Sequence, residues 1–188
     1  MLDIHLLADI APKDVREFAR YVQIKDGEVR FTDSIVAVWI PQKEIFGSEV
    51  FGKTYEYYFL LSEWQKVKAY SAKKFLFDIF EESLIVLDEK GDKKTIELKD
   101  PASLGFKYPI IDGFKKEAST DPVPVDPSFG INPFTLFTLQ RVIYGRTSLG
   151  IVKQNGVSIS LVSKGRIWKV KHGGISGILA VLKTLENM

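Results

Sequence analysis

Carboxylates are the side chains in this sequence best suited to chemistry, and they occur in small clusters. Glu81 and Glu82 are adjacent, and Asp88 and Glu89 follow a short distance along the chain. Paired carboxylates can bind Mg²⁺ or act as general acid and general base. Both clusters flank a segment with a hairpin pattern, where acidic side chains are usually solvated surface groups. A metal-dependent hydrolase that uses Glu81, Glu82 and Asp88 is therefore one alternative that the sequence leaves open.

Other catalytic arrangements are missing from the sequence. The chain has no cysteine, and its two histidines, His5 and His172, lie near opposite ends. Thiol catalysis and thiolate metal sites are therefore excluded, and imidazole-based catalysis has little to work with. Glycine-rich nucleotide-binding motifs, the zinc-peptidase motif and the nucleophile-elbow motif do not occur. Because no site combines two cooperating members, we expect a protein that is not an enzyme and needs no cofactor or metal.

Composition places the chain among ordinary globular proteins. It has 188 residues, of which 45% are hydrophobic and 27% charged, with a net charge of +2. The lack of cysteine fits a reducing compartment, and the N-terminus has acids inside its apolar run, unlike a signal peptide. No apolar run approaches the roughly 18 residues of a membrane span. We therefore expect a cytoplasmic protein without a membrane partner.

Three segments have helical patterns, and each carries positive charge opposite its apolar side. The first begins at Pro12 and is expected to reach Val22, with one apolar stripe. The second opens at Ser62 with a capping-box pattern, and the third has Asn132 as N-cap with Pro133 in the first turn. The basic residues that these helices and their ends are expected to expose are Lys13, Arg16, Arg20, Lys66, Lys68, Lys73, Arg141 and Arg146.

These basic residues suggest a surface for phosphate. If the three helices lie side by side, their exposed sides form a strip that neutralises phosphates without reading base sequence. On the third helix, Thr135, Thr138 and Arg141 share one stripe that contains no carboxylate. The alternative is that these lysines and arginines only solvate helix surfaces.

The rest of the pattern predicts antiparallel strands. A hairpin is expected through Lys25-Asp26-Gly27, a second through residues 89–92, and a meander with turns at Asn155-Gly156 and Lys164-Gly165. Residues 42–53 are expected to form a loop. After Gly173-Gly174, the apolar residues Ile175, Ile178, Leu179 and Leu182 fit one face of a C-terminal helix. The expected fold is α+β, with few helices on one face of antiparallel sheets.

This organisation repeats. Residues 1–117 are expected to form one domain of two helix-plus-strands units, and residues 118–128 a proline-rich linker. Residues 129–188 are expected to form a third unit that ends in the C-terminal helix.

Several stretches resemble the DNA polymerase sliding clamps of the bacterial beta-clamp type. "YVQIKDGEVRFTDSIVAVWIP" looks like the strand–turn–strand of that family, and "LLSEWQKVKAYSAKKFLFDIF" is similar to the opening of a second half-domain. "SLIVLDEKGDKKTIEL" followed by "FKYPIIDGF" looks like the family's hairpin and exit segment. "FGINPFTLFTLQRVIYG" looks like the start of the last half-domain.

The resemblance implies a non-enzymatic processivity factor for DNA replication. Its implied partners are double-stranded DNA, bound without sequence preference, other copies of the same chain, and a polymerase or other replication protein. Two features depart from the family: three units are expected where a clamp domain has two, and a C-terminal helix where clamps finish on a strand. Short, divergent clamp-like chains suggest a phage or mobile-element source. The alternative is a structural or interaction protein that reuses the clamp fold without DNA.

Overall fold

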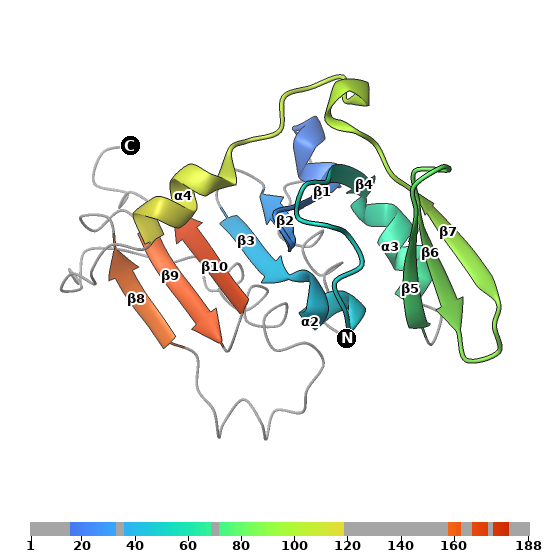
Figure 1. Cartoon of the computed structure of the whole chain (residues 1–188). Helices are drawn as coiled ribbons and strands as arrows, with labels where there is room; N and C mark the ends of the chain where they lie inside the picture. The colour runs from blue at the N-terminus through green and yellow to red at the C-terminus, as the bar shows by residue number, and fades with distance from the viewer. Residues whose placement is uncertain are drawn as a thin grey trace.

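Two antiparallel sheets form the frame of the chain in the computed structural model (Figure 1). The structure describes residues 16–32, 36–68, 72–118, 158–162, 167–172 and 175–180. The larger sheet has seven strands in the order β4-β1-β2-β3-β10-β9-β8. Their bounds are β1 (Tyr21–Lys25), β2 (Glu28–Thr32), β3 (Val36–Pro41), β4 (Glu56–Leu60), β8 (Ser158–Val162), β9 (Ile167–His172) and β10 (Ile175–Ala180).

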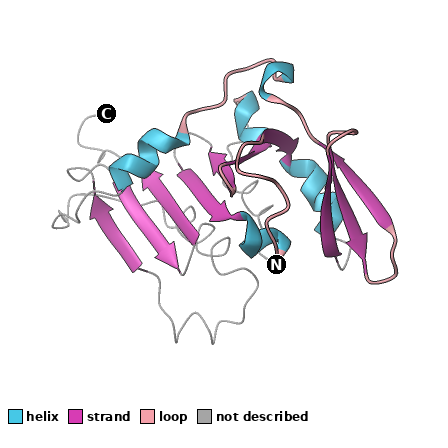
Figure 2. Cartoon of the chain, viewed as in Figure 1, coloured by secondary structure: helices cyan, strands magenta, loops and turns pink. Residues whose placement is uncertain are grey.

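The smaller sheet has three strands in the order β5-β6-β7. They are β5 (Ala72–Asp78), β6 (Ser83–Asp88) and β7 (Lys93–Glu97). Short helices connect and cover the sheets (Figure 2). The described helices are η2 (Glu17–Arg20), α2 (Gln42–Phe46), α3 (Leu61–Lys68), η3 (Pro101–Ser103) and α4 (Ile111–Ala118). The expected α+β fold class is therefore confirmed.

The β1–β2 hairpin forms where the sequence predicts it. Asp26 and Gly27 have φ angles of 54° and 77°, the left-handed pair that a two-residue turn with matching strand twist requires. Glycine adopts this conformation without strain, and aspartate is among the residues that tolerate it. The β6–β7 hairpin is also confirmed, and the pairing of β8 with β9 confirms the part of the predicted meander that lies within the described residues. Its turns at Asn155-Gly156 and Lys164-Gly165 lie outside them.

The first and third units share one sheet. β10 pairs antiparallel with β3, from Ser176 opposite Trp39 to Leu179 opposite Val36. Across the sheet, β1, β2 and β3 of the first unit are followed by β10, β9 and β8 of the third unit. The last strands of the two units, β3 and β10, therefore lie side by side. This pairing occurs within one chain. The expected linker lies, apart from Ala118, outside the described residues, so a domain division there stays a prediction.

The predicted C-terminal helix is wrong for residues 175–180, which form strand β10. Its apolar residues fit a helix face, but a short apolar run fits a buried strand equally well. Pairing with β3 on one side and β9 on the other supplies its backbone hydrogen bonds. Leu182 and the residues after it lie outside the described residues.

Three local predictions also need correction. The first helix is a short 3₁₀ turn in its described part, and Val22 belongs to β1, where pairing with β2 and β4 holds the backbone extended. The predicted loop 42–53 begins with α2, which Gly47 ends in a left-handed conformation at φ 75°. Gln42 is buried there, and its side chain exchanges hydrogen bonds with the backbone of Phe51. Helix α4 was not expected.

The main core lies between the two sheets and around α3. Trp64 of α3 stacks on Phe75 of β5 with ring centroids 5.9 Å apart and also contacts Phe59 of β4. Phe46 and Phe51 extend this aromatic cluster. α3 contacts both β4 and β7, so it joins the two sheets. The capping-box pattern at Ser62 therefore marked a real helix, although the helix begins one residue earlier, at Leu61.

A second core covers the other face of the larger sheet. Tyr58 neighbours Phe59 in β4, so their side chains point to opposite faces. Tyr58 belongs to a buried cluster with Tyr21, Trp39, Tyr108 and Ile111, the first residue of α4. The hydroxyl of Tyr108 donates to the carbonyl of Tyr21 at 3.3 Å. Helix α4 thus lies on the face opposite α3, and it also contacts β9.

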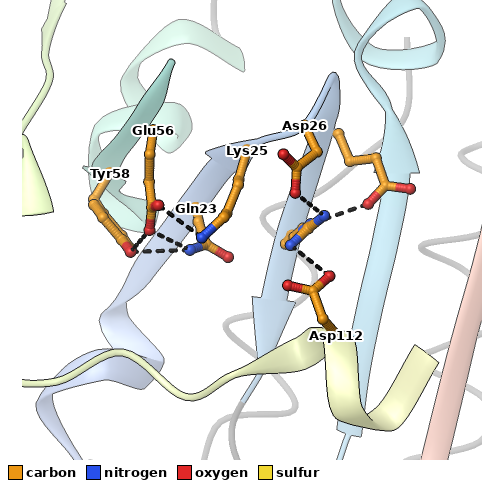
Figure 3. Close-up of polar contacts among 8 residues, drawn as sticks. Gln23, Lys25, Asp26, Glu56, Tyr58 and Asp112 are labelled. Carbon is orange, nitrogen blue, oxygen red and sulfur yellow. Dashed lines mark hydrogen bonds and ion pairs between the residues drawn. The ribbon is translucent and has the colours of Figure 1, made fainter. Parts of the chain in front are cut away.

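A buried arginine fixes α4 to this face. The side chain of Arg30 is 2% exposed, and its guanidinium contacts three carboxylates (Figure 3). Nε lies 3.0 Å from Glu28, Nη2 lies 2.9 Å from Asp26, and Nη1 lies 3.1 Å from Asp112 of α4. The planar guanidinium presents five donors in a fixed fork, so it holds several carboxylates in one defined geometry, whereas the lysine ammonium has three donors on a flexible stem. One side chain therefore ties the β1–β2 turn, strand β2 and α4 together.

A second polar network lies on the neighbouring strands. Lys25 Nζ lies 2.7 Å from Glu56, and the Gln23 amide donates to Glu56 and to the Tyr58 hydroxyl, each at 2.9 Å (Figure 3). The Tyr58 hydroxyl also donates to Glu56. Burial alone would raise the pKa of Glu56, but these hydrogen bonds and the charge of Lys25 outweigh it and lower that pKa. Burial and the bond to Glu56 raise the pKa of Tyr58.

Replacing Arg30 should destabilise the fold strongly. Arg30→Met leaves the carboxylates of Asp26, Glu28 and Asp112 clustered without their shared cation, and we expect a loss of about 3 kcal/mol in the free energy of unfolding. Urea denaturation measures it. Arg20→Met, at an exposed position on η2, is the matched control and should change stability by less than about 0.5 kcal/mol. Equal stability of the two variants would contradict this role of Arg30.

Acid should remove the contribution of Glu56. Its pKa is lower in the folded chain than its usual value of 4.5, so ionised Glu56 stabilises the fold above that value. This stability is lost as the pH falls through the folded pKa. In urea denaturation at a series of pH values from neutral to acid, Glu56→Gln should be less stable than the parent near neutrality, and the difference should shrink on acidification. Glu44→Gln, exposed on α2, should show no such trend.

Candidate nucleic-acid interface

Two of the predicted cations extend from the 3₁₀ turn η2. Arg16 precedes the turn and Arg20 ends it, and both side chains are exposed. Ala19 between them is buried, and the Phe18 ring meets Tyr108 edge-on with centroids 6.2 Å apart. Anchoring by Phe18 and Ala19 therefore leaves both arginines at the surface, as the sequence predicts.

Helix α3 supplies the third described cation. Trp64 and Val67 are buried, which turns Lys66 to the exposed side. Lys66 Nζ lies 2.6 Å from the carboxylate of Glu63, one turn earlier. An exposed pair of this kind contributes little stability and exchanges readily for another anion. A phosphate that binds Lys66 must therefore compete with Glu63.

Lys94 of β7 is a cation near α3 that the sequence analysis missed. Its Nζ donates to the backbone carbonyl of Lys66 at 2.7 Å, although the two residues are 28 positions apart. A cation at the C-terminal end of a helix satisfies a carbonyl that lacks a partner within the helix and interacts favourably with the helix dipole. No local pattern in the sequence could reveal this contact, because it depends on the packing of β7 against α3.

The structure does not test the strip of cations as a whole. Lys68 ends α3 and Lys73 lies in β5, and only their backbone positions are described. Lys13, Arg141, Arg146 and the acid-free stripe of the third predicted helix lie outside the described residues. η2 and α3 anchor in different clusters, Phe18 against Tyr108 and Trp64 against Phe75. A single continuous strip therefore stays a prediction.

The carboxylates of the alternative hydrolase site do not converge. Glu81 and Glu82 lie in the turn before β6, whereas Asp88 ends that strand. A strand of this length separates its ends by roughly 20 Å, too far for one metal ion. Asp88 instead accepts the backbone N–H groups of Lys90 and Asp92 and so shapes the β6–β7 turn. Within the part of the chain that the structure describes, no group of three or more possible metal ligands occurs.

The described helices are also all too short or too polar to cross a membrane. His172 ends β9, and His5 lies outside the described residues.

Among comparisons with known proteins, only the comparison of structures finds similar proteins. No protein-family model matches the chain, and no curated protein sequence does. Solved structures of bacterial clamps match in arrangement. The Helicobacter pylori beta clamp in complex with 5-chloroisatin superimposes with a TM-score of 0.52 at 11% identity, covering 98% of this chain and 61% of the clamp.

Clamps from other bacteria give the same result. The DNA polymerase sliding clamp of Bacillus subtilis matches with a TM-score of 0.51 at 10% identity, over 95% of this chain and 62% of the clamp. A putative DNA polymerase III beta subunit from Eubacterium rectale matches with a TM-score of 0.52 at 7% identity, over 95% of this chain and 61% of that protein.

The match covers nearly the whole of this chain but only about three fifths of each clamp. It includes the strands of the third unit as well as the first two. At identities of 7% to 11% the likeness shows the fold, carried by the order of the elements and not by side chains. The chain has a divergent form of the sliding-clamp fold.

Proposed function

We propose that this chain is a non-enzymatic DNA-binding protein of the sliding-clamp type, which acts as a processivity factor or is a relative of one. The observation that supports this function best is the clamp-like arrangement of nearly the entire chain, from η2 to β10. The partner is double-stranded DNA, bound through its phosphates and not through base edges.

The described cations suit that partner. Arg16 and Arg20 lie exposed on one short turn, and Lys66 lies exposed on α3. An arginine or lysine at such a position displaces a counterion from the DNA without fixing the duplex in one register. Contacts of this kind allow movement along DNA, which a processivity factor needs.

The proposed function also implies that the chain associates with copies of itself and binds other replication proteins. A sliding clamp holds DNA by surrounding it, so we expect this chain to associate with other copies of itself. One of the matching structures is a Helicobacter pylori beta clamp bound to a DNA ligase peptide. By analogy, we expect a polymerase or another replication protein to bind this chain.

Charge reversal should weaken DNA binding in a salt-dependent manner. We expect the full chain to bind duplex DNA at low salt, with an affinity that falls steeply as salt rises. Changing Arg16, Arg20 and Lys66 together to glutamate should flatten the slope of log affinity against log salt by roughly 2 to 3 units, since each phosphate contact contributes about 0.9. Fluorescence anisotropy of a labelled duplex at several salt concentrations measures this slope.

The matched control carries the same change in net charge at other exposed lysines. Lys43 on α2, Lys53 and Lys107 are exposed and lie outside the predicted set. Their combined change to glutamate should leave most of the slope intact. An equal effect of both triple variants would show that only net charge matters, and salt-independent or absent binding would overturn the DNA partner.

One observation favours the alternative of an interaction protein without DNA. Phe80 in the β5–β6 turn is 93% exposed and its neighbour Ile79 is 48% exposed. An exposed aromatic at a turn tip is a common anchor for a protein partner. If the chain fails to bind DNA but retains its fold, this alternative becomes the better interpretation.

A further inference from the structure

The three-stranded sheet has one face that the described helices leave open. α3 lies against the other face, where Trp64 stacks on Phe75 of β5 (Figure 1). Side chains alternate between the two faces of a strand, so Leu76 points away from α3, and it is 39% exposed. Of the four large apolar residues that are exposed in the described part of the chain, three are Leu76 and, in the turn after β5, Ile79 and Phe80. An exposed apolar surface of this kind commonly marks a contact site.

The register of the sheet orders the side chains of this open face into three rows, each with one residue from β5, β6 and β7. From one end of the strands to the other, the rows are Lys74, Leu87 and Lys93, then Leu76, Ile85 and Thr95, then Asp78, Ser83 and Glu97. The two lysines and Glu97 are exposed, and Asp78, Ile85 and Leu87 are half-buried. The open face therefore has a basic end, an apolar middle and an acidic end.

This arrangement complements itself under a two-fold rotation. When a second copy lies face to face on the first, with the rotation axis along the middle row, the strands of the two sheets run antiparallel. Lys74 then lies opposite Asp78 of the other copy, and Lys93 lies opposite Glu97. Leu76 and Ile85 meet their own counterparts at the axis. Sheets that pack face to face keep their strand directions within about 30° of each other, so the rows stay aligned.

The charges also select this orientation. If the strands of the two sheets ran parallel, the lysine rows would lie opposite each other, and so would the carboxylate rows. Like charges that face each other across an interface oppose association. The antiparallel arrangement instead places four pairs of opposite charge around one apolar centre. The pattern of the open face therefore favours a second copy of the same chain in one defined orientation.

We propose that the open face is a self-association surface, on which two copies of the chain pack with Leu76 and Ile85 at the centre and each lysine row against the carboxylate row of the other copy. The contact is made by side chains and involves no strand edge. It uses the same patch on both copies, as closed dimers do. α3, which carries the exposed Lys66, packs on the opposite side of this sheet, so the contact leaves Lys66 accessible to DNA. The inference goes beyond the proposed function, and either can fail without the other.

The area of the open face limits the strength of the contact. Three strands spaced about 4.8 Å apart, with five residues that each rise about 3.3 Å, give a face of roughly 14 Å by 17 Å. Such a patch buries less than the about 800 Å² per partner of a standard interface. The dimer is therefore a weak one, whose population rises with protein concentration.

Sedimentation velocity of the full chain, from low micromolar to several hundred micromolar concentration, tests the proposal. The parent chain should shift from monomer toward dimer. Leu76→Lys replaces the apolar contact at the axis by two facing ammonium groups and should remain monomeric over the whole range. Lys93→Glu and Glu97→Lys each turn two attractive pairs into repulsive ones and should raise the dimer dissociation constant about tenfold. The double variant restores opposite charges and should return the constant to within about threefold of the parent.

Lys74→Glu separates this contact from pairing along the edge of β7, because β5 and β7 lie on opposite sides of β6. It should weaken the dimer as much as Lys93→Glu does. Lys43→Glu, exposed on α2 and with the same change in net charge, is the matched control and should leave the dissociation constant unchanged. All variants should keep the far-ultraviolet circular dichroism spectrum of the parent. A parent chain that stays monomeric at the highest concentration would overturn the proposal. So would a dimer that Lys74→Glu or Leu76→Lys leaves unchanged, or one that Lys43→Glu weakens equally.

Discussion

The pairing of β3 with β10 is the contact on which the rest of the architecture depends. It is the only strand contact that joins the first and third units within the described residues, and it makes a single sheet from segments more than a hundred positions apart. Non-local strand pairing brings a large loss of chain entropy, which buried apolar surface must offset. α4 lies on this sheet, contacts β9 and is bound to β2 through Arg30, so it bridges the two units that β3 and β10 join.

This arrangement explains why polar and apolar side chains share the face beneath α4. Tyr21, Trp39, Tyr58 and Ile111 supply buried surface, and Arg30 makes the position of α4 specific. A buried arginine is costly unless every donor finds an acceptor, and here three carboxylates meet it. The opposite face is apolar, with aromatic contacts around Trp64 and buried aliphatic side chains such as Val22, Ile24 and Ile40. The α4 face of the larger sheet is therefore stabilised by ion pairs as well as by buried apolar surface, and the α3 face by apolar packing. The short helices need contribute little stability of their own.

The features that could be predicted from the sequence are those with local causes. Asp26-Gly27 specified its hairpin because the turn conformation belongs to those two residues, and the pattern at Ser62 indicated a helix there, although Ser62 lies inside α3 and not at its N-cap. Strand β10 was mistaken for a helix because an apolar run satisfies both periods, and only the pairing with β3 and β9 selects the strand. Helix α4 escaped notice because Gly113 interrupts it, and its stability comes from Ile111 and Asp112 docking on a distant sheet. The exposure of Arg16, Arg20 and Lys66 followed from periodicity, whereas the contact of Lys94 with α3 required the assembled fold.

The proposed function requires that this chain holds DNA by surrounding it, in assemblies built on the clamp fold. The most direct measurement is retention on circular against linear DNA after a salt challenge. Protein is assembled at low salt on a nicked plasmid, the salt is raised until phosphate contacts no longer hold, and half of the sample is then cut once with a restriction enzyme. If the protein encloses DNA, it stays on the circle and is lost from the cut plasmid. Equal loss from both forms would contradict it, because contact without enclosure does not distinguish a circle from a line.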